Sequence, residues 1–160
     1  MRLTDVDQLF VPENVAVFGA SDREGSVGGM VYRNLIAGGC KGSCYPVNPK
    51  WDEVAGNRCY KNLAELERTL DLALIVTPAE TVPGILDQCG EAGVKAAVVL
   101  SAGFGEHGGR GAALQERLVE AARRNRIRVL GPNCLGVMRP SYGLNASCMS
   151  TLAAPGKVAL

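Results

Sequence analysis

Short apolar runs alternate along the chain with longer segments in which apolar residues recur at helical spacing. The runs lie at 15–18, 43–47, 72–76, 96–100 and 128–130, and a turn-forming residue follows each of them. The run at 72–76 is continuous, as expected of a strand that is buried on both faces. Strands that alternate with helices in this way predict a parallel sheet with helices on both of its faces.

The segments between these runs carry apolar stripes that predict three main helices. Gly38 and Gly39 stop the first helix, and Gly93 ends the second. We expect Thr81 to cap the second helix and Asn62 to cap a short additional one. The apolar positions are Val27, Met30, Val31 and Leu35 in the first helix, Val82, Ile85, Leu86 and Cys89 in the second, and Leu114, Leu118, Ala121 and Ala122 in the third.

The fold class that this pattern predicts is α/β, a Rossmann-like open parallel sheet that extends over residues 1–150. The chain has 160 residues, of which 47% are hydrophobic and 21% charged, and its net charge is +1, which suits a domain with a single core. Because no basic stripe and no bilayer-length apolar run accompany this composition, we expect neither nucleic acid nor a membrane as partner. The N-terminal residues include acids and no signal-peptide core, which favours a cytoplasmic location.

Six cysteines and one histidine raise the question of disulfides or a metal site. No pair has Cys-x-x-Cys spacing, and Cys40 and Cys44 stand apart from other ligand types, so we expect no metal site and no disulfide framework. Cys89 lies on an apolar helical stripe, which indicates a core residue. Cys134, at a strand end, is expected to pack rather than react, and His107, in a glycine-rich loop, to have no catalytic role. The other two cysteines are Cys59 and Cys148.

The last residues of the sequence, 155–160, have the pattern of a turn followed by a strand that has only begun. A strand that starts there has no later element to pack against. We therefore expect residues 151–160 to be the truncated start of a following domain, and the sequence to be a piece of a longer protein.

Five polar or glycine-rich segments follow the five predicted strands. They lie at 19–22, 48–50, 77–78, 101–103 and 131–134. Turns favour such residues whether or not a ligand binds. The carboxyl ends of parallel strands, however, meet at one edge of the sheet, where open α/β sheets bind their ligands. The sequence therefore predicts a ligand site at this edge.

The turn at 19–21 joins a hydrophobic strand to a helix, an arrangement in which backbone N–H groups hold a phosphate. The residues after Gly19 do not follow the Gly-x-Gly-x-x-Gly pattern of dinucleotide-binding domains, because the loop before Ser26 is longer. Arg23 adds a cation beside the expected phosphate. Two alternatives stay open: Gly19 serves only a positive φ, and Ser21 serves only as a helix N-cap.

Lys50 stands about where a nicotinamide-binding domain carries an acid for the ribose 2′-hydroxyl. A cation at this place suits a ligand with an additional phosphate on its ribose. Coenzyme A, with its 3′-phosphate, is therefore favoured over NAD. The alternative is a solvated lysine without a ligand.

Six short motifs follow one another in order. They are VFGAS at 17–21, GSVG at 25–28, YPVNPK at 45–50, SAGF at 101–104, GPNCLG at 131–136 and GLNA at 143–146. Together they resemble the CoA-binding domain that NDP-forming acyl-CoA synthetases share with the α subunit of succinyl-CoA ligase. The resemblance runs from about Leu9 to the last residue without large gaps.

This resemblance implies a Rossmann-like domain that holds coenzyme A or an acyl-CoA. The glycine turn and the start of the next helix would lie near the pantetheine and the phosphates, and the loop after the second strand near the nucleotide end. Asn133 and Cys134 would lie toward the thiol. The residues that the resemblance and the strand ends assign to CoA are Gly19, Ala20, Ser21, Asp22, Arg23, Ser26, Val27, Gly28, Asn48, Pro49, Lys50, Thr77, Pro78, Ser101, Ala102, Gly103, Asn133 and Cys134.

In that family an acyl phosphate is made, a histidine takes the phosphoryl group, and a nucleotide accepts it. The histidine belongs to the next domain, and His107 does not match its motif. The resemblance therefore implies no catalytic residue in this chain, which we expect to bind CoA and to be inactive alone. ATP or ADP would enter only through the remaining ligase domains, carried by the parent chain or by a partner subunit.

Two other functions stay open at this point. Large bacterial protein lysine acetyltransferases carry a similar domain at the N-terminus, where the binding of CoA or acetyl-CoA is regulatory. A stand-alone module that senses CoA or a nucleotide is the second. An ATP-grasp domain or an acetyltransferase domain elsewhere in the parent protein would distinguish these possibilities.

Overall fold

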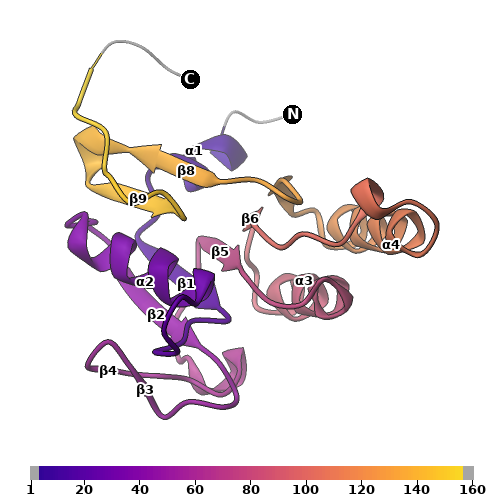
Figure 1. The fold of residues 1–160 in the computed structure, drawn as a ribbon, viewed down its shortest axis with the longest axis horizontal. Coiled ribbons are helices and arrows are strands. Elements are labelled where there is room, and N and C mark those ends of the chain that lie inside the picture. Colours follow the sequence, from indigo (N-terminus) through magenta and orange to yellow (C-terminus); the bar gives the residue numbers. More distant parts are fainter. Residues whose placement is uncertain (1–3, 157–160) are drawn as a thin grey trace.

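The computed structural model describes residues 4–156 and is built around a five-stranded parallel sheet (Figure 1). The strand order is β2-β1-β5-β6-β7, and every neighbouring pair is parallel. All five predicted strands and the α/β fold class are confirmed. The strands are β1 (Asn14–Phe18), β2 (Ser43–Val47), β5 (Leu72–Ile75), β6 (Ala96–Val99) and β7 (Arg128–Leu130).

A single residue, Tyr60, takes the place of a further strand beside β2. It forms an isolated parallel bridge with Val47, in which the Tyr60 N–H donates to Pro46 O at 2.9 Å and Asn48 N–H donates to Tyr60 O at 2.8 Å. Counting this bridge as the third strand gives the order 3-2-1-4-5-6 of dinucleotide-binding sheets. The order reverses between β1 and β5, so the switch point lies at their carboxyl ends.

Helices cover both faces of the sheet because successive strand residues point to opposite sides. Ala16 and Phe18 of β1 face the core beneath α3 (Val82–Glu91) and α4 (Gly109–Asn125). Val15 and Val17 face the core beneath α1 (Thr4–Phe10) and α2 (Val27–Ala37). Figure 1 shows α3 and α4 side by side, on the other side of the sheet from α2.

A hairpin takes the place of a helix on the α2 face. Its strands are β8 (Gly136–Arg139) and β9 (Leu144–Ser147), and all four residues of β9 are buried. The Asn34 side-chain amide on α2 donates to Ser147 O at 2.9 Å and to Met149 O at 2.7 Å. This one side chain therefore fastens the hairpin and the segment after it to α2.

Several smaller elements were not predicted from the sequence. They include α1, the hairpin of β3 (Glu53–Val54) and β4 (Asn57–Arg58), and three 3-10 helices at Ala79–Thr81, Gly105–His107 and Pro140–Tyr142. The short helix predicted after Asn62 is present as a 3-10 turn, Leu63–Glu65, and the Asn62 side chain accepts from Ala64 N–H at 2.9 Å.

Thr81 stands at the predicted N-cap position of α3, but its side chain makes no capping hydrogen bond. It already belongs to the 3-10 turn that precedes the helix, and its Oγ1 lies 2.7 Å from Pro78 O and 2.8 Å from Thr77 Oγ1. The predicted core position of Cys89 is confirmed, because the residue is fully buried and burial raises the pKa of its thiol to about 12. In the α4 stripe, Ala122 is only half-buried.

The end of the chain leaves two expectations as predictions. Of the strand expected near the C-terminus, residues 157–160 lie outside the described part of the structure. A following domain over 151–160 is therefore not tested. Between residues 4 and 156, no helix combines the length and the apolar character needed to cross a bilayer.

Replacing Asn34 by alanine is expected to lower the free energy of unfolding by about 1–3 kcal/mol, because two carbonyl groups lose their only side-chain donor. Urea unfolding followed by circular dichroism measures this. Gln88→Ala is the matched control, since Gln88 is an exposed helical amide on α3. Equal stabilities of the two variants would show that the amide does not hold the hairpin.

Candidate functional site

The segments predicted to form a site do meet at the carboxyl edge of the sheet. Backbone hydrogen bonds link neighbouring segments: Gly19 N–H donates to Val47 O at 2.9 Å, and Asn133 N–H donates to Ser101 O at 3.0 Å. Ser101 Oγ also donates to Ile75 O at 3.3 Å. The loops after β2, β1, β5, β6 and β7 therefore form one continuous rim in the order of the strands.

Glycine is required at the turn after β1 whether or not a ligand binds. Gly19 has a φ of +89°, and a Cβ at this position would lie 2.5 Å from Val76 O. Gly28, in the first turn of α2, packs so closely on the turn that a Cβ there would overlap Gly19 O. Gly19 thus has the positive φ considered from the sequence, and whether it also contacts a phosphate stays a prediction. The close packing brings the start of α2 against the turn.

Ser26, and not Ser21, is the N-cap of α2. Ser26 Oγ accepts from Gly29 N–H at 2.9 Å, whereas the buried Ser21 Oγ accepts from Arg23 N–H at 3.0 Å and tightens the turn. The capping alternative for Ser21 was therefore wrong. In the described structure the N–H groups of Val27 and Gly28, the first two of the helix, have no intrahelical acceptor. No acidic residue lies in this first turn, so the helix end is suited to an anion.

Asp22 is engaged with the protein itself. Its carboxylate accepts from Ala55 N–H at 2.9 Å and lies 3.5 Å from the Arg33 guanidinium. These contacts tie the β3–β4 hairpin to the turn after β1. Because the charge of Asp22 is partly compensated in this way, the carboxylate opposes an anion at the start of α2 less strongly.

Asn48 joins two of the loops. Its Nδ2 donates to Ala20 O at 2.8 Å, and its Oδ1 accepts from Lys50 N–H at 3.0 Å. The side chain of Lys50 is exposed at the rim, as is that of Arg23. Neither cation forms an ion pair within the described residues. Arg23 lies three residues before the cap Ser26, and Lys50 is linked through Asn48 to the turn after β1; a contact of Lys50 with a ligand stays a prediction.

The far half of the rim is shaped by backbone geometry. Gly103 has a φ of +108° and Asn133 a φ of +54°. Glu106, which the sequence did not single out, accepts from Gly103 N–H at 2.6 Å, and this and other backbone N–H groups hold its pKa below the ordinary value. His107 is exposed on the same 3-10 turn. Four further predicted residues lie on the loops of the rim. Thr77 is half-buried, and the exposed ones are Pro49, Pro78 and Ala102.

Cys134 is a packed thiol. Its Sγ donates to Val99 O at 3.4 Å, and burial raises the pKa of the thiol above its ordinary value, although N–H groups of Gly136 and Cys134 oppose that change. The expectation of packing is supported over that of a reactive thiol. All six cysteines are free, and the side chains described between residues 6 and 156 include no group of three or more His, Cys, Asp or Glu that could hold a metal ion.

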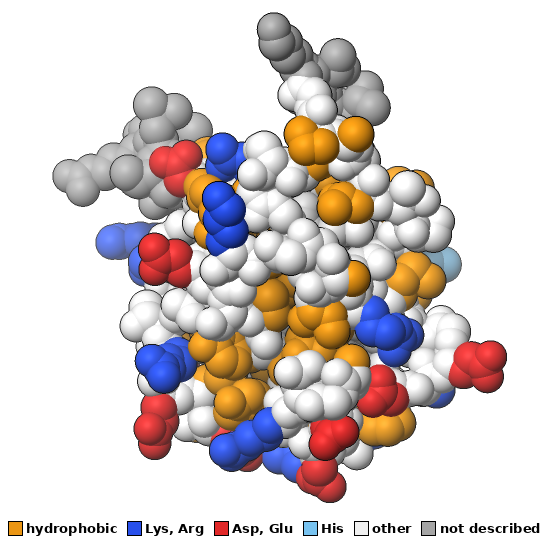
Figure 2. Space-filling view, turned by 90° about the vertical axis from the view of Figure 1, so that its left-hand side faces the viewer, with side chains coloured by type: hydrophobic (Ala, Val, Ile, Leu, Met, Phe, Trp, Pro, Cys, Tyr) orange, Lys and Arg blue, Asp and Glu red, His pale blue; other side chains and the backbone are white. Residues whose placement is uncertain are grey.

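The charged side chains do not form one large patch near α2. Figure 2, which views the molecule from the left of Figure 1, shows Lys and Arg interspersed with Asp and Glu around a central hydrophobic area. On this face, positive charge therefore comes from single side chains and not from a continuous basic surface. The cations that matter for the rim are the individual residues described above.

Comparisons with known proteins show which proteins the chain is similar to. Residues 13–140 match the family model described as CoA binding domain. The chain is 43% identical over 156 residues to an acetate–CoA ligase (ADP-forming) of Methanocaldococcus jannaschii, covering 98% of this chain and 22% of that protein. It is 42% identical over 159 residues to the α subunit of acetate–CoA ligase (ADP-forming) I of Pyrococcus furiosus, covering 97% of this chain and 34% of the subunit.

Solved structures show the same relationship. A Pyrococcus horikoshii protein superposes with a TM-score of 0.89 at 42% identity, covering 94% of this chain and 34% of that one. A dinucleotide-forming acetyl-coenzyme A synthetase 1 of Ca. Korarchaeum cryptofilum, in complex with phosphate and ADP, superposes with a TM-score of 0.85 at 41% identity. The match covers 91% of this chain and 31% of that one. The chain thus spans about a fifth to a third of the relatives that it matches.

Alkylation of Cys134 by iodoacetamide at neutral pH is expected to be slower in the folded chain than in urea, because a raised pKa of the thiol leaves less thiolate. In the folded chain the rate should keep rising at pH values where the unfolded thiol has levelled off. Peptide mapping by mass spectrometry follows the residue. Equal rates in both states would identify Cys134 as a reactive thiol.

Proposed function

The chain belongs to the CoA binding domain family, and on this premise we propose that it holds coenzyme A as the CoA-binding domain of an ADP-forming acyl-CoA synthetase. The observation that carries the proposal is the start of α2. Two N–H groups without an intrahelical acceptor, at Val27 and Gly28, begin a helix whose first turn has no acid, and the adjoining loops carry the exposed cations Arg23 and Lys50. A phosphorylated ligand fits this set of donors.

The phosphates of CoA have two kinds of partner in this proposal. The pyrophosphate lies at the start of α2, where the backbone at 19–21 and 26–28 comes close and Arg23 supplies charge. The 3′-phosphate lies toward Lys50, on the loop after β2. The pantetheine then follows the rim past Thr77, Pro78 and the segment 101–103, and the thiol lies toward Asn133 and Cys134.

Two of the residues assigned to CoA act on it indirectly. Asp22 holds the β3–β4 hairpin through Ala55 N–H, and Asn48 links Ala20 to Lys50. We infer that both are positioning residues, whose own polar atoms are already engaged. The rim is thereby set before the ligand arrives, which reduces the entropy cost of binding.

The complete enzyme would need parts that lie outside this chain. ADP-forming ligases among the relatives occur as one long chain or as a separate α subunit. We propose that the remaining ligase domains, in the same protein or in a partner subunit, carry the phosphohistidine and the ADP or ATP site. This domain would then supply CoA for the interconversion of acyl phosphate and acyl-CoA, with no catalytic side chain of its own.

Titration calorimetry with CoA and with NAD on the same preparation tests the proposal. CoA is expected to bind more tightly, because the loop after β2 offers Lys50 where NAD needs an acid for its ribose. Gly19→Val should weaken both ligands together, since a branched side chain cannot occupy this positive φ beside Val76 O. Binding of NAD without CoA would reject the proposed function.

Dephospho-CoA is expected to bind about tenfold more weakly than CoA, and Lys50→Ala should remove that difference, because a charge-assisted contact contributes about 1.5–3 kcal/mol and this one is exposed. The difference should also shrink as salt is added. Lys95→Ala is the matched control. Lys95 is an exposed lysine directly before the amino end of β6, whereas the proposed site lies at the carboxyl ends of the strands. If Lys50→Ala distinguishes the two ligands as the parent does, Lys50 is a solvated lysine only.

A further inference from the structure

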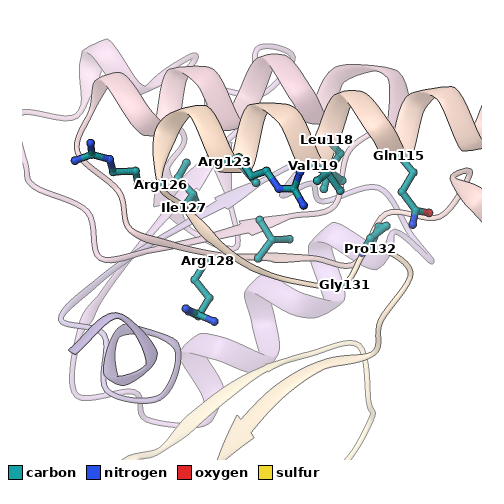
Figure 3. A pocket seen from close by; sticks show the side chains of 11 residues that line it. Gln115, Leu118, Val119, Arg123, Arg126, Ile127, Arg128, Gly131 and Pro132 are labelled. Atoms are coloured by element: carbon teal, nitrogen blue, oxygen red, sulfur yellow. The ribbon is translucent and has the colours of Figure 1, made fainter. Parts of the chain in front are cut away.

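A concave surface lies between α4 and β7. This groove has a volume of about 450 Å³ and runs along β7 to Gly131 and Pro132 (Figure 3). Its floor is apolar and its borders carry three arginines and one glutamine. The other residues that line it are Gln115, Leu118, Val119, Ala122, Arg123, Arg126, Ile127, Arg128 and Val129.

Among the side chains that the structure describes, from 6 to 156, the arginines of the groove form no ion pair. The neighbouring Arg124, in contrast, is bound by Asp87 at 2.7 Å on the side of α3. The Nε of Arg128 is buried and has no hydrogen-bond partner in the described structure. Because Figure 3 shows the Arg128 side chain on the side of β7 that faces away from α4, the groove has a local excess of two positive charges, from Arg123 and Arg126, and no acid in its lining.

The edge of the sheet is open along this groove. β7 pairs with β6 on one side only, and Arg128 N–H donates to Lys95 O in that pairing. Backbone groups of successive strand residues alternate in direction, so the N–H and C=O of Val129 face the unpaired side. An extended segment laid beside β7 could bond to them while its side chains reach the apolar floor.

We propose that the groove binds an extended acidic segment of a partner polypeptide, in which acidic side chains alternate with apolar ones. Apolar side chains would lie on the half-buried Val119 and Val129, above the buried Leu118 and Ile127, and carboxylates would pair with Arg123 and Arg126. A second copy of this chain is disfavoured, because pairing two β7 edges would bring Arg123 and Arg126 of both copies together. A small anion would pair with the arginines but would leave the outward-facing backbone groups of Val129 unpaired.

A synthetic probe tests the proposal without knowledge of the natural partner. The peptide acetyl-Glu-Val-Glu-Val-Glu-Val-amide should bind the chain in fluorescence anisotropy, and a Lys-Val peptide of the same length should not. The variant Arg123→Glu/Arg126→Glu should lose at least about tenfold in affinity for the Glu-Val peptide and gain affinity for the Lys-Val peptide. Arg110→Glu/Arg117→Glu, an equal charge change on exposed positions of α4, should alter neither by more than about twofold.

Hydrogen exchange of the Val129 amide is the second measurement, and bound Glu-Val peptide should slow it at least about tenfold. Two results would overturn the proposal: equal affinity of the parent chain for both peptides, or equal affinity of the parent and of Arg123→Glu/Arg126→Glu for the Glu-Val peptide. So would complete displacement by inorganic phosphate at matched ionic strength, which would indicate a small-anion site. Dimerisation of the parent in sedimentation, lost in the reversed variant, would identify a second copy as the occupant.

Discussion

The contact between the first turn of α2 and the turn after β1 determines the geometry of the rest of the site. Gly28 lies against Gly19 O, and Gly19 in turn lies against Val76 O of the neighbouring strand's loop. No Cβ fits at either glycine, so helix, turn and sheet approach as closely as backbone allows. This proximity brings the free N–H groups of α2 to the switch point between β1 and β5, where an open sheet is hollow.

Side chains around that contact are used mainly to hold loops in place. Ser21 tightens the turn, Asp22 fastens the β3–β4 hairpin, and Asn48 joins the loops after β1 and β2. In the proposed complex, recognition is consequently left to backbone N–H groups and to the exposed cations Arg23 and Lys50. Such a division makes the ligand's charge and shape decisive, because few side-chain hydrogen bonds remain available to it.

The sequence predicted the parallel sheet well because its strands are short apolar runs, buried on both faces and closed by turns. The β8–β9 hairpin was not predicted, since β9 (Leu144–Ser147) mixes polar and apolar residues, and Asn145 and Ser147 are buried only because they bond to each other. The role of Asp22 depends on an N–H group 33 residues away, which no local pattern reveals. Ser26, directly before the apolar residue Val27, was the one missed cap that a local signal could have found.

The two edges of the sheet differ in a way that links fold and recognition. At the β2 edge, the Tyr60 bridge takes up backbone groups that would otherwise be unpaired. The β7 edge has no such cover and is protected by its length of three residues and by the arginines around it. Cations that repel a second copy of the same edge attract an acidic strand. One set of side chains can therefore prevent self-association and select a partner, so that both properties would be lost together when the charge of the groove is reversed.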